Sequence, residues 1–372
     1  MITIGGKDIA DIVIDNKNVV KVQDATTLEI MWQKTTPVVV DYFYIENTYS
    51  GSNTITINTI DQSPIANHAT SLQYSKDQST WTTITLSGTN TILMNSGEKV
   101  YFRNNNGYFN CIDFKTIFSC NKKHKVGGNI NTLLNYQNLS GVTLSEDCFL
   151  ELFNGNTTLR NAYNLTLPSM ILAPSCYVNM FYNCTNLTSP PRILPATTLT
   201  SGCYNEMFSG CTSLMVTPEL PATTLAQYCY RQMFWNCTNL EDAPSLVATT
   251  LAQGCYKQMF AGCTSMTNAM YWLPATTLAE DCYWGMFAGC SALTTAPQLL
   301  ATTLEDGCYY WMFQNCSSLN SVTTNANDIS APDCLYNWLQ GVSNSGTFHN
   351  LGSATYPTGT SGIPSGWTEV NS

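Results

Sequence analysis

Cysteine recurs at a nearly constant interval along the C-terminal two-thirds of this 372-residue chain. Successive members of the series stand 28, 27, 26, 26, 27, 26 and 26 residues apart: Cys148, Cys176, Cys203, Cys229, Cys255, Cys282, Cys308 and Cys334. All units except the first and last read Cys-Tyr-x-x-Met-Phe-x-[Gly/Asn]-Cys. This period predicts a stack of about eight coils that share one core, with the two degenerate end units as caps.

Each unit carries a pattern that predicts a short helix followed by strands. If the first cysteine is position 0, the apolar residues at positions 0, 1, 4 and 5 would line one face of a helix. Position 7 is always Gly or Asn, which readily adopt the left-handed conformation at a helix end. The Thr-rich segments that follow, such as residues 194–199, favour strands. The expected fold class is α+β, with a solenoid of about eight coils of 26–28 residues over residues 116–342 and a C-terminal cap over residues 343–372.

Two all-β domains are expected before the repeats. In residues 1–36, short alternating apolar runs are separated by the turn signals Gly5-Gly6-Lys7 and Asp15-Asn16-Lys17-Asn18. This pattern predicts a small β-meander that ends at Trp32, with a domain boundary at Pro37. Residues 37–115 predict a β-sandwich, because short alternating segments are separated by turns. Its candidate strands are residues 38–45, 54–58, 71–75, 80–85, 91–94 and 99–103.

The sixteen cysteines could in principle form disulfides or bind a metal ion. Two cysteines of one unit would be about 12 Å apart in a helix, which is too far for a disulfide. Cysteines at the same position in neighbouring coils would point in parallel rather than toward each other. A zinc site is not expected, because no Cys-x-x-Cys pair is present and the histidines His68, His124 and His349 lie in unrelated segments. The cysteines are therefore predicted to be reduced and buried, as small apolar side chains.

Composition and charge argue against several classes of function. The chain has 15 Lys and Arg against 25 Asp and Glu, so it lacks the basic footprint of a nucleic-acid-binding protein. It has no apolar run of the length that membrane insertion requires. Its first residues do not read as a secretory signal, which predicts synthesis and folding in a cytoplasm. No set of side chains suggests catalysis, so we expect no enzyme activity, no cofactor and no metal.

Aromatic and basic residues gather at the variable positions of the C-terminal coils. Motif positions 2, 3 and 6 and the bend after the motif supply the candidate ligand-binding residues: Arg231, Trp235, Lys257, Tyr271, Trp272, Trp284, Tyr310 and Trp311. If they are exposed together, they form a patch suited to sugar rings or to a protein partner. Alternatively, the aromatic rings pack against one another along the coils or against a symmetry-related subunit. The sequence leaves both interpretations open.

The repeat motif resembles a known family. Cys-Tyr-x-x-Met-Phe-x-Gly-Cys-Thr-Ser-Leu with Leu-Pro-Ala-Thr-Thr-Leu resembles the BspA-like leucine-rich repeats of gut Bacteroidales and their phages. Residues 327–338, 346–348 and 362–367 resemble the usual ending of these proteins, so the resemblance covers roughly residues 116–370. It implies a leucine-rich-repeat solenoid with an adhesive or recognition role and brings no catalytic residues. Residues 2–34 resemble N-terminal modules of phage virion proteins, and residues 72–77 with Trp81 resemble a β module that often precedes such repeats.

These resemblances imply a phage virion structural protein, such as a tail or head fibre or appendage, that displays its repeats for host recognition. Residues 1–36 would bind other virion proteins, and the repeats would bind a host-surface glycan or protein. A homo-oligomer is compatible with this role, and the expected location is the virion. Two alternatives stay open, namely a bacterial cell-surface adhesin exported by another route and a purely architectural virion protein without a receptor.

Overall fold

The computed structural model describes residues 2–4, 7–15, 18–24, 30–33, 40–61 and 69–371. The chain forms two compact units, Met1–Asp41 and Tyr42–Ser372. In the first unit, four strands pair antiparallel in chain order, which is the arrangement of a meander: β1 (Ile2–Ile4), β2 (Lys7–Asp15), β3 (Asn18–Asp24) and β4 (Ile30–Gln33). The expected turn residues 5–6 and 16–17 and the expected boundary at Pro37 lie outside the described residues.

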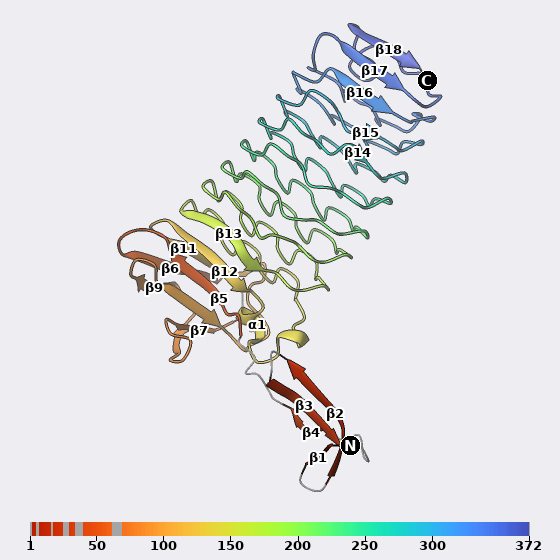
Figure 1. Ribbon diagram of the computed structural model, residues 1–372. Helices are drawn as coiled ribbons and strands as arrows, with labels where there is room; N and C mark the ends of the chain where they lie inside the picture. Colours follow the sequence, from red (N-terminus) through yellow and green to blue (C-terminus); the bar gives the residue numbers. More distant parts are fainter. Residues whose placement is uncertain are drawn as a thin grey trace. The chain divides into compact units, whose positions relative to one another are not determined.

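The second unit begins with two packed sheets (Figure 1). A six-stranded sheet has the order β13-β12-β5-β10-β7-β8, and a three-stranded sheet has the order β11-β6-β9. Along β11, buried residues alternate with half-buried ones, as one face of a strand against a core requires. The strands are β5 (Phe43–Asn47), β6 (Asn53–Asp61), β7 (Ser71–Ser75), β8 (Thr82–Thr85), β9 (Thr89–Met94), β10 (Lys99–Arg103), β11 (Phe114–Cys120), β12 (His124–Asn129) and β13 (Leu159–Thr166).

The sheets extend past the domain boundary that the sequence predicts. The boundary expected between residues 115 and 116 falls inside β11, and β12 follows it as another strand of the six-stranded sheet. β13 belongs to the first coil and pairs parallel with β12. The described helices are both short and lie between β12 and β13: α1 (Thr132–Asn135) and the 3-10 helix η1 (Leu139–Gly141). The sandwich and the coils therefore share one continuous sheet, because β12 provides the edge on which the first coil is built.

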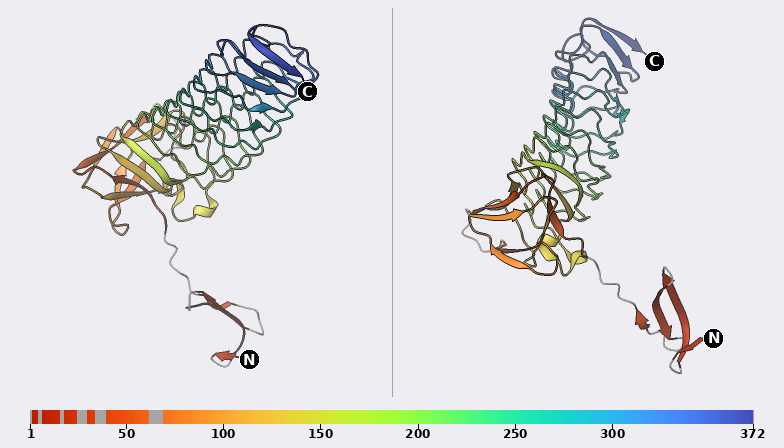
Figure 2. Two further views of the ribbon diagram at one scale, coloured as in Figure 1. Left: turned by 45° about the horizontal axis from the view of Figure 1, so that its top comes forward. Right: turned by 60° about the vertical axis from the view of Figure 1, so that its left-hand side comes forward.

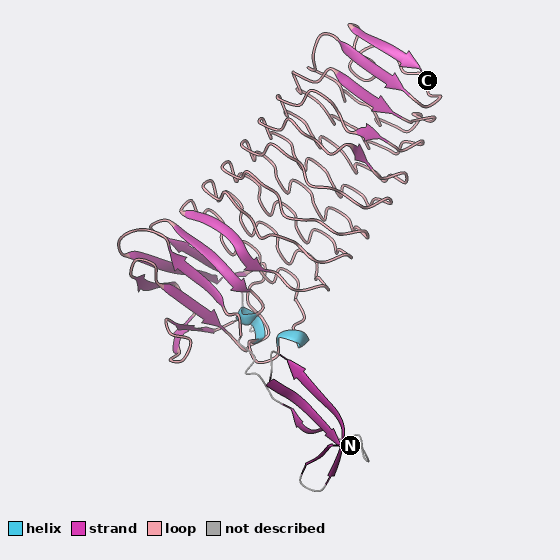
Figure 3. Ribbon diagram, in the orientation of Figure 1, coloured by secondary structure: helices cyan, strands magenta, loops and turns pink. Residues whose placement is uncertain are grey.

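The helix predicted in each repeat unit is wrong. The motif segments, all within the described residues, form chains of turns instead (Figure 3). In all eight units the residues at positions −1, 3 and 7 have a positive φ, as Ser175, Asn179 and Asn183 do in the coil that begins at Cys176. The left-handed residue expected at position 7 is thus present, but two more occur in every unit. A helix cannot pass through a left-handed residue every fourth position, so the fold class is mostly strands and turns rather than α+β.

Hydrogen bonding explains why the motif segment does not coil into a helix. The N–H groups of Tyr177, Asn179 and Phe181 donate to carbonyl oxygens of the next coil, at 3.0, 3.1 and 2.9 Å. The N–H groups of Val178 and Met180, which lie between them, donate within their own coil, each to the carbonyl of the third residue before it. The same alternation recurs in the other inner coils. An α-helix would use all of these donors internally, whereas the alternation satisfies them and also links neighbouring coils.

After the motif, the chain bends and forms parallel pairs with its neighbours. In the early coils these pairs are single bridges, such as Asn161 with Ser189 and Asp242 with Asn268. The Thr-rich segments, which were expected to form strands, also pair through single bridges, such as Thr198 with Thr224. Toward the C-terminus they become a five-stranded parallel sheet (Figures 1 and 2). Its strands are β14 (Trp272–Leu273), β15 (Gln298–Leu299), β16 (Ser321–Thr324), β17 (Gly346–Asn350) and β18 (Trp367–Asn371). Residues 343–372, expected as a cap, thus add two further strands to the sheet.

Two columns of stacked aromatic rings fill the inside of the coils. The position-1 rings, from Phe149 to Tyr309, and the position-5 rings, from Phe153 to Phe313, stack with centroids 5.2 to 6.0 Å apart. Trp338 follows both columns, at 6.2 Å from Tyr309 and 6.5 Å from Phe313. Its indole N–H donates to the carbonyl of Gly362 at 2.9 Å. Both columns therefore end on one large ring that is fully buried and hydrogen-bonded, and Tyr356 stacks on its other side at 6.3 Å.

The cysteines are buried, as predicted, and half of the motif cysteines also have a polar contact. All sixteen are free thiols, and all except Cys111 are buried. At position 8, each thiol donates to the position-5 carbonyl oxygen of the preceding coil, at 3.0 to 3.2 Å, as Cys184 does to Phe153. In the first coil Asn156 takes the cysteine's place, and its amide donates to the carbonyl of Phe118 in β11 at 3.2 Å. Cysteine at this position thus combines a small apolar side chain with a weak donor.

Candidate functional site

The structure places the eight candidate residues on two different segments of the coil. Six of them, Arg231, Trp235, Lys257, Trp284, Tyr310 and Trp311, belong to the turns of the motif. Tyr271 and Trp272 lie on the bend, where Trp272 begins β14. The side chains of the first group are all half-buried, whereas those of the second are exposed. The two groups therefore differ in their access to solvent.

The first group contains a cluster of rings that pack on one another, here called the turn cluster: Lys257, Trp284, Tyr310, Trp311 and Tyr336. The ring centroids of Trp284 and Tyr310 are 5.4 Å apart, and those of Tyr310 and Trp311 are 4.9 Å apart. Tyr336 stacks on Tyr310 at 4.7 Å. Tyr336 is not among the candidates predicted from the sequence, although it occupies position 2 of the last, degenerate unit and so continues the same row.

Lys257 holds one end of the turn cluster. Its Nζ lies 2.9 Å from the centroid of the Trp284 ring and 3.0 Å from Oδ2 of Asp281. Burial lowers the pKa of Lys257, and the hydrogen bond to Asp281 opposes that shift. Arg231 forms a longer ion pair, with Nη1 4.0 Å from Oε1 of Glu206. Both basic side chains are thus paired with acids of a neighbouring coil.

The indole groups of the turn cluster are oriented toward protein rather than solvent. Nε1 of Trp284 and Nε1 of Trp311 are buried and have no acceptor in the described part of the chain. An unpaired buried N–H is unfavourable, so ring packing must compensate for it. This geometry favours the interpretation in which these aromatic residues pack along the coils. Trp235 lies apart from the cluster, on the coil that begins at Cys229.

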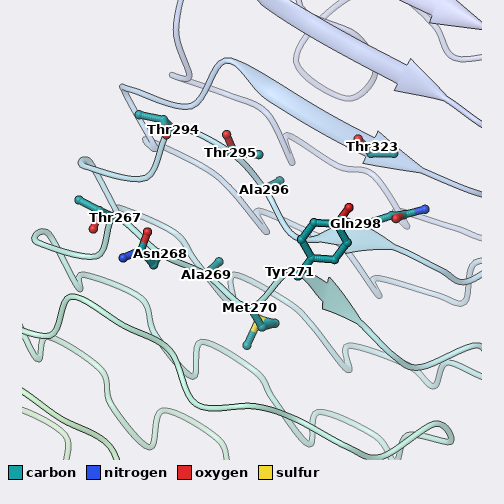
Figure 4. A pocket seen from close by; sticks show the side chains of 10 residues that line it. All are labelled: Thr267, Asn268, Ala269, Met270, Tyr271, Thr294, Thr295, Ala296, Gln298 and Thr323. Carbon is teal, nitrogen blue, oxygen red and sulfur yellow. The ribbon is translucent and has the colours of Figure 1, made fainter.

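Tyr271 and Trp272 form a second, more accessible group. Their side chains are 80% and 51% exposed, and their rings meet edge to face with centroids 5.2 Å apart. Beside Tyr271, three successive coils enclose an open concavity of about 380 Å³. Ten residues line it, all of them uncharged (Figure 4). Its polar lining is Thr267, Asn268, Thr294, Thr295, Gln298 and Thr323.

Two amide side chains of this concavity are held in place by neighbouring coils. Asn268 donates its amide N–H to Oδ1 of Asp242 at 2.8 Å. Gln298 donates to Oδ1 of Asn325 at 3.1 Å, and its backbone N–H donates to the carbonyl of Tyr271, also at 3.1 Å. Each amide oxygen accepts no hydrogen bond within the described residues. The concavity therefore presents two fixed acceptors beside an exposed ring.

The remaining sequence candidates form no further site. His124 is fully buried at the junction of sandwich and coils, His349 lies in β17, and His68 lies outside the described residues. In the described part of the chain, no group of three or more His, Cys, Asp or Glu side chains could hold a metal ion. No described helix is long and apolar enough to cross a membrane.

Comparison with known proteins yields one likeness. No protein-family model matches the chain, and no curated protein matches it. A crystal structure of a leucine-rich repeat protein from Bacteroides ovatus is similar to it, with 14% sequence identity and a TM-score of 0.21. The similarity covers 62% of this chain and 79% of that one.

Proposed function

We propose that this chain is a non-catalytic recognition protein, built on a leucine-rich-repeat solenoid, that binds a cell surface through the bends of its C-terminal coils. The observation that carries the proposal is the exposed pair Tyr271 and Trp272 beside an uncharged concavity. Two adjacent exposed aromatic rings beside a concavity with several polar groups have the features of a ligand-binding site. The turn cluster, whose residues pack on one another, supports the proposal less.

The setting we propose is a phage virion, in which the chain is a structural protein of a fibre or appendage. The separate unit Met1–Asp41 supports this arrangement, because a small β unit of its own can attach to other virion proteins while the coils meet the host. The adhesin of a bacterial surface and the purely architectural virion protein are the other outcomes of the tests below.

The first test asks where the protein is. Purified phage particles from a culture that carries the gene are analysed by mass spectrometry, and intact particles are labelled with immunogold. Abundant peptides in the particles, with label at a tail tip or on the capsid, are the expected result. Label on bacterial cells, with none on particles, would replace the virion setting with the adhesin.

The second test asks whether the bend residues bind. The full chain, fluorescently labelled, is added to candidate host bacteria beside the double variant Tyr271→Ala/Trp272→Ala. We expect the variant to lose at least tenfold in cell binding. Tyr108→Ala is the matched control, because Tyr108 is also an exposed aromatic residue, at 47%, but lies outside the coils. Equal binding by the double variant would favour the architectural role.

A further inference from the structure

We propose that the concavity beside Tyr271 is a binding site for a neutral oligosaccharide. This inference rests on the proposed recognition function and makes it more specific, since it names both the ligand class and the subsite. It is carried by the type of side chain that lines the concavity, by the way in which neighbouring coils hold those side chains, and by the charge around them.

The lining matches the groups that sugars present. The hydroxyls of Thr294, Thr295 and Thr323 can each donate and accept, as sugar hydroxyls can. The amide oxygens of Asn268 and Gln298 add acceptors for hydroxyl donors. Because these polar groups come from three successive coils, they are spread along the stack, as an extended ligand requires. The volume, about 380 Å³, lies within the usual range of ligand pockets of about 300 to 1,000 Å³.

Tyr271 supplies the apolar surface. Its ring is 80% exposed and stands at the concavity, where Figure 4 places it next to Gln298. The ring of Trp272 lies nearly perpendicular to it, at 85°, and supports it from the side. An aromatic face beside fixed hydrogen-bonding groups suits the C–H face of a pyranose, whose other positions bear hydroxyls.

The amides are positioned before any ligand arrives. Asp242 and Asn325, from neighbouring coils, each accept one amide N–H and so fix the direction of the Asn268 and Gln298 side chains. Side chains that are already ordered lose less conformational entropy on binding. Open loops of Thr and Asn without such contacts would lack this advantage.

Charge selects a neutral ligand. None of the ten lining residues is basic, so the concavity offers no partner to a carboxylate or sulfate. The Asp242 carboxylate, 2.8 Å from the amide nitrogen of Asn268, would repel an anionic sugar, and the chain as a whole has a net charge of −10. The basic residues Lys257 and Arg231 belong to the turns of the motif and are paired there with Asp281 and Glu206.

The experiment uses the labelled full chain on an array of neutral, sialylated and sulfated oligosaccharides, followed by titration calorimetry with the strongest neutral one. We expect neutral oligosaccharides to bind best. Tyr271→Ala and Gln298→Ala should each weaken that binding at least tenfold, and Tyr271→Phe should keep it within about threefold because the ring face remains. Tyr310→Ala, in the turn cluster, is the control and should bind like the unchanged chain. Because Tyr271 is so exposed, the variant is expected to fold, and a circular dichroism spectrum checks this.

Three results would overturn the inference: no neutral oligosaccharide bound at millimolar concentration, anionic oligosaccharides bound best, or unchanged binding by Tyr271→Ala. Host cells separate this failure from failure of the proposed function. If periodate-treated cells bind the protein as well as untreated cells do, while protease-treated cells do not, recognition stands and the glycan inference falls. If neutral oligosaccharides bind through Tyr271 but the protein does not bind host cells, the oligosaccharide site is supported and host recognition is refuted.

Discussion

Position 7 of the motif obeys a pairing rule between neighbouring coils. The residue there is Gly or Asn and always has a positive φ. Where Asn occurs, the next coil has Gly, as in Asn183 before Gly210 and Asn236 before Gly262. A Cβ built on Gly262 would overlap Oδ1 of Asn236, whereas one built on Gly289 meets nothing closer than 3.7 Å. The Asn side chain thus occupies the space that Gly leaves open.

A pair of variants tests this rule. Gly262→Ala and Gly289→Ala both place alanine at a positive φ, which costs about 1 to 2 kcal/mol at either site. In Gly262→Ala the new methyl group also overlaps the side chain of Asn236. We therefore expect Gly262→Ala to be about 1 kcal/mol less stable than Gly289→Ala. Urea unfolding followed by circular dichroism measures the difference. Adding Asn236→Gly to Gly262→Ala should restore the additional stability that the overlap costs. Equal stability of the two single variants would refute the rule.

At the scale of elements, a buried histidine joins the sandwich to the first coil. Nδ1 of His124 lies 3.1 Å from the carbonyl oxygen of Lys122, and Nε2 lies 3.1 Å from the amide nitrogen of Asn156. A carbonyl can only accept and this amide nitrogen can only donate, so the ring is neutral with its proton on Nδ1. Burial lowers the pKa of His124 from 6.5 to about 4. The junction therefore depends on an uncharged imidazole.

The junction should weaken in acid. Because the pKa of His124 is lower in the folded chain than its ordinary value, folding favours the neutral ring. The stabilisation is complete above pH 6.5 and is lost as the pH falls toward 4, by on the order of 3 kcal/mol. Urea unfolding at a series of pH values measures this slope. His124→Gln should be less stable at pH 7 but should have a flatter profile between pH 6.5 and 4; parallel profiles would contradict the prediction.

The cysteine rows give a second prediction for the elements. Burial raises the pKa of the Cys184 and Cys263 thiols to about 12, and the position-0 row shifts in the same direction. Thiol reagents attack the thiolate, so these groups should not react while the coils are stacked. With an aromatic disulfide reagent we expect rapid labelling only at Cys111, which is half-buried, and labelling of all sixteen cysteines in denaturant. Cys111→Ser should abolish the rapid phase; several fast thiols in the variant would mean that the coils open readily.

At the scale of the whole molecule, the chain forms two compact units, Met1–Asp41 and Tyr42–Ser372. The second unit contains the sandwich, the coils and the C-terminal sheet, and its core runs without a break from Phe43 to Trp367. A unit with a core of its own should fold independently. We therefore expect each unit to fold without the other.

Deletion tests that separation. The chain of residues 42–372 should keep the circular dichroism spectrum and melting temperature of the full chain's second unit, because its core is complete. Under the proposed function it should still bind host cells but be absent from purified particles, as mass spectrometry would detect. Incorporation of this shortened chain into particles would remove the docking role from the N-terminal unit.

The sequence by itself determined the repeat, the burial of its motif residues and the left-handed residue at position 7, because these depend on local composition and on period. It also predicted strands at residues 71–75 and 99–103, which are β7 and β10. Only the tertiary structure decided that the motif is not helical. The apolar spacing fits a helix, but the N–H groups at alternate positions find better-placed acceptors in the next coil than in their own.

The tertiary structure also decided which aromatic residues are accessible. From the sequence, Trp284, Tyr310 and Trp311 look like Tyr271 and Trp272, since all are large rings at variable positions. Stacking of the coils brings the first three together with Tyr336 and Lys257, so they cover one another. Tyr271 and Trp272 lie on the bend, beside a concavity that exists only because three coils lie side by side. The contacts between coils join residues that are about 26 positions apart in the sequence. The residue pattern within a single unit predicts the period, but it does not predict these contacts.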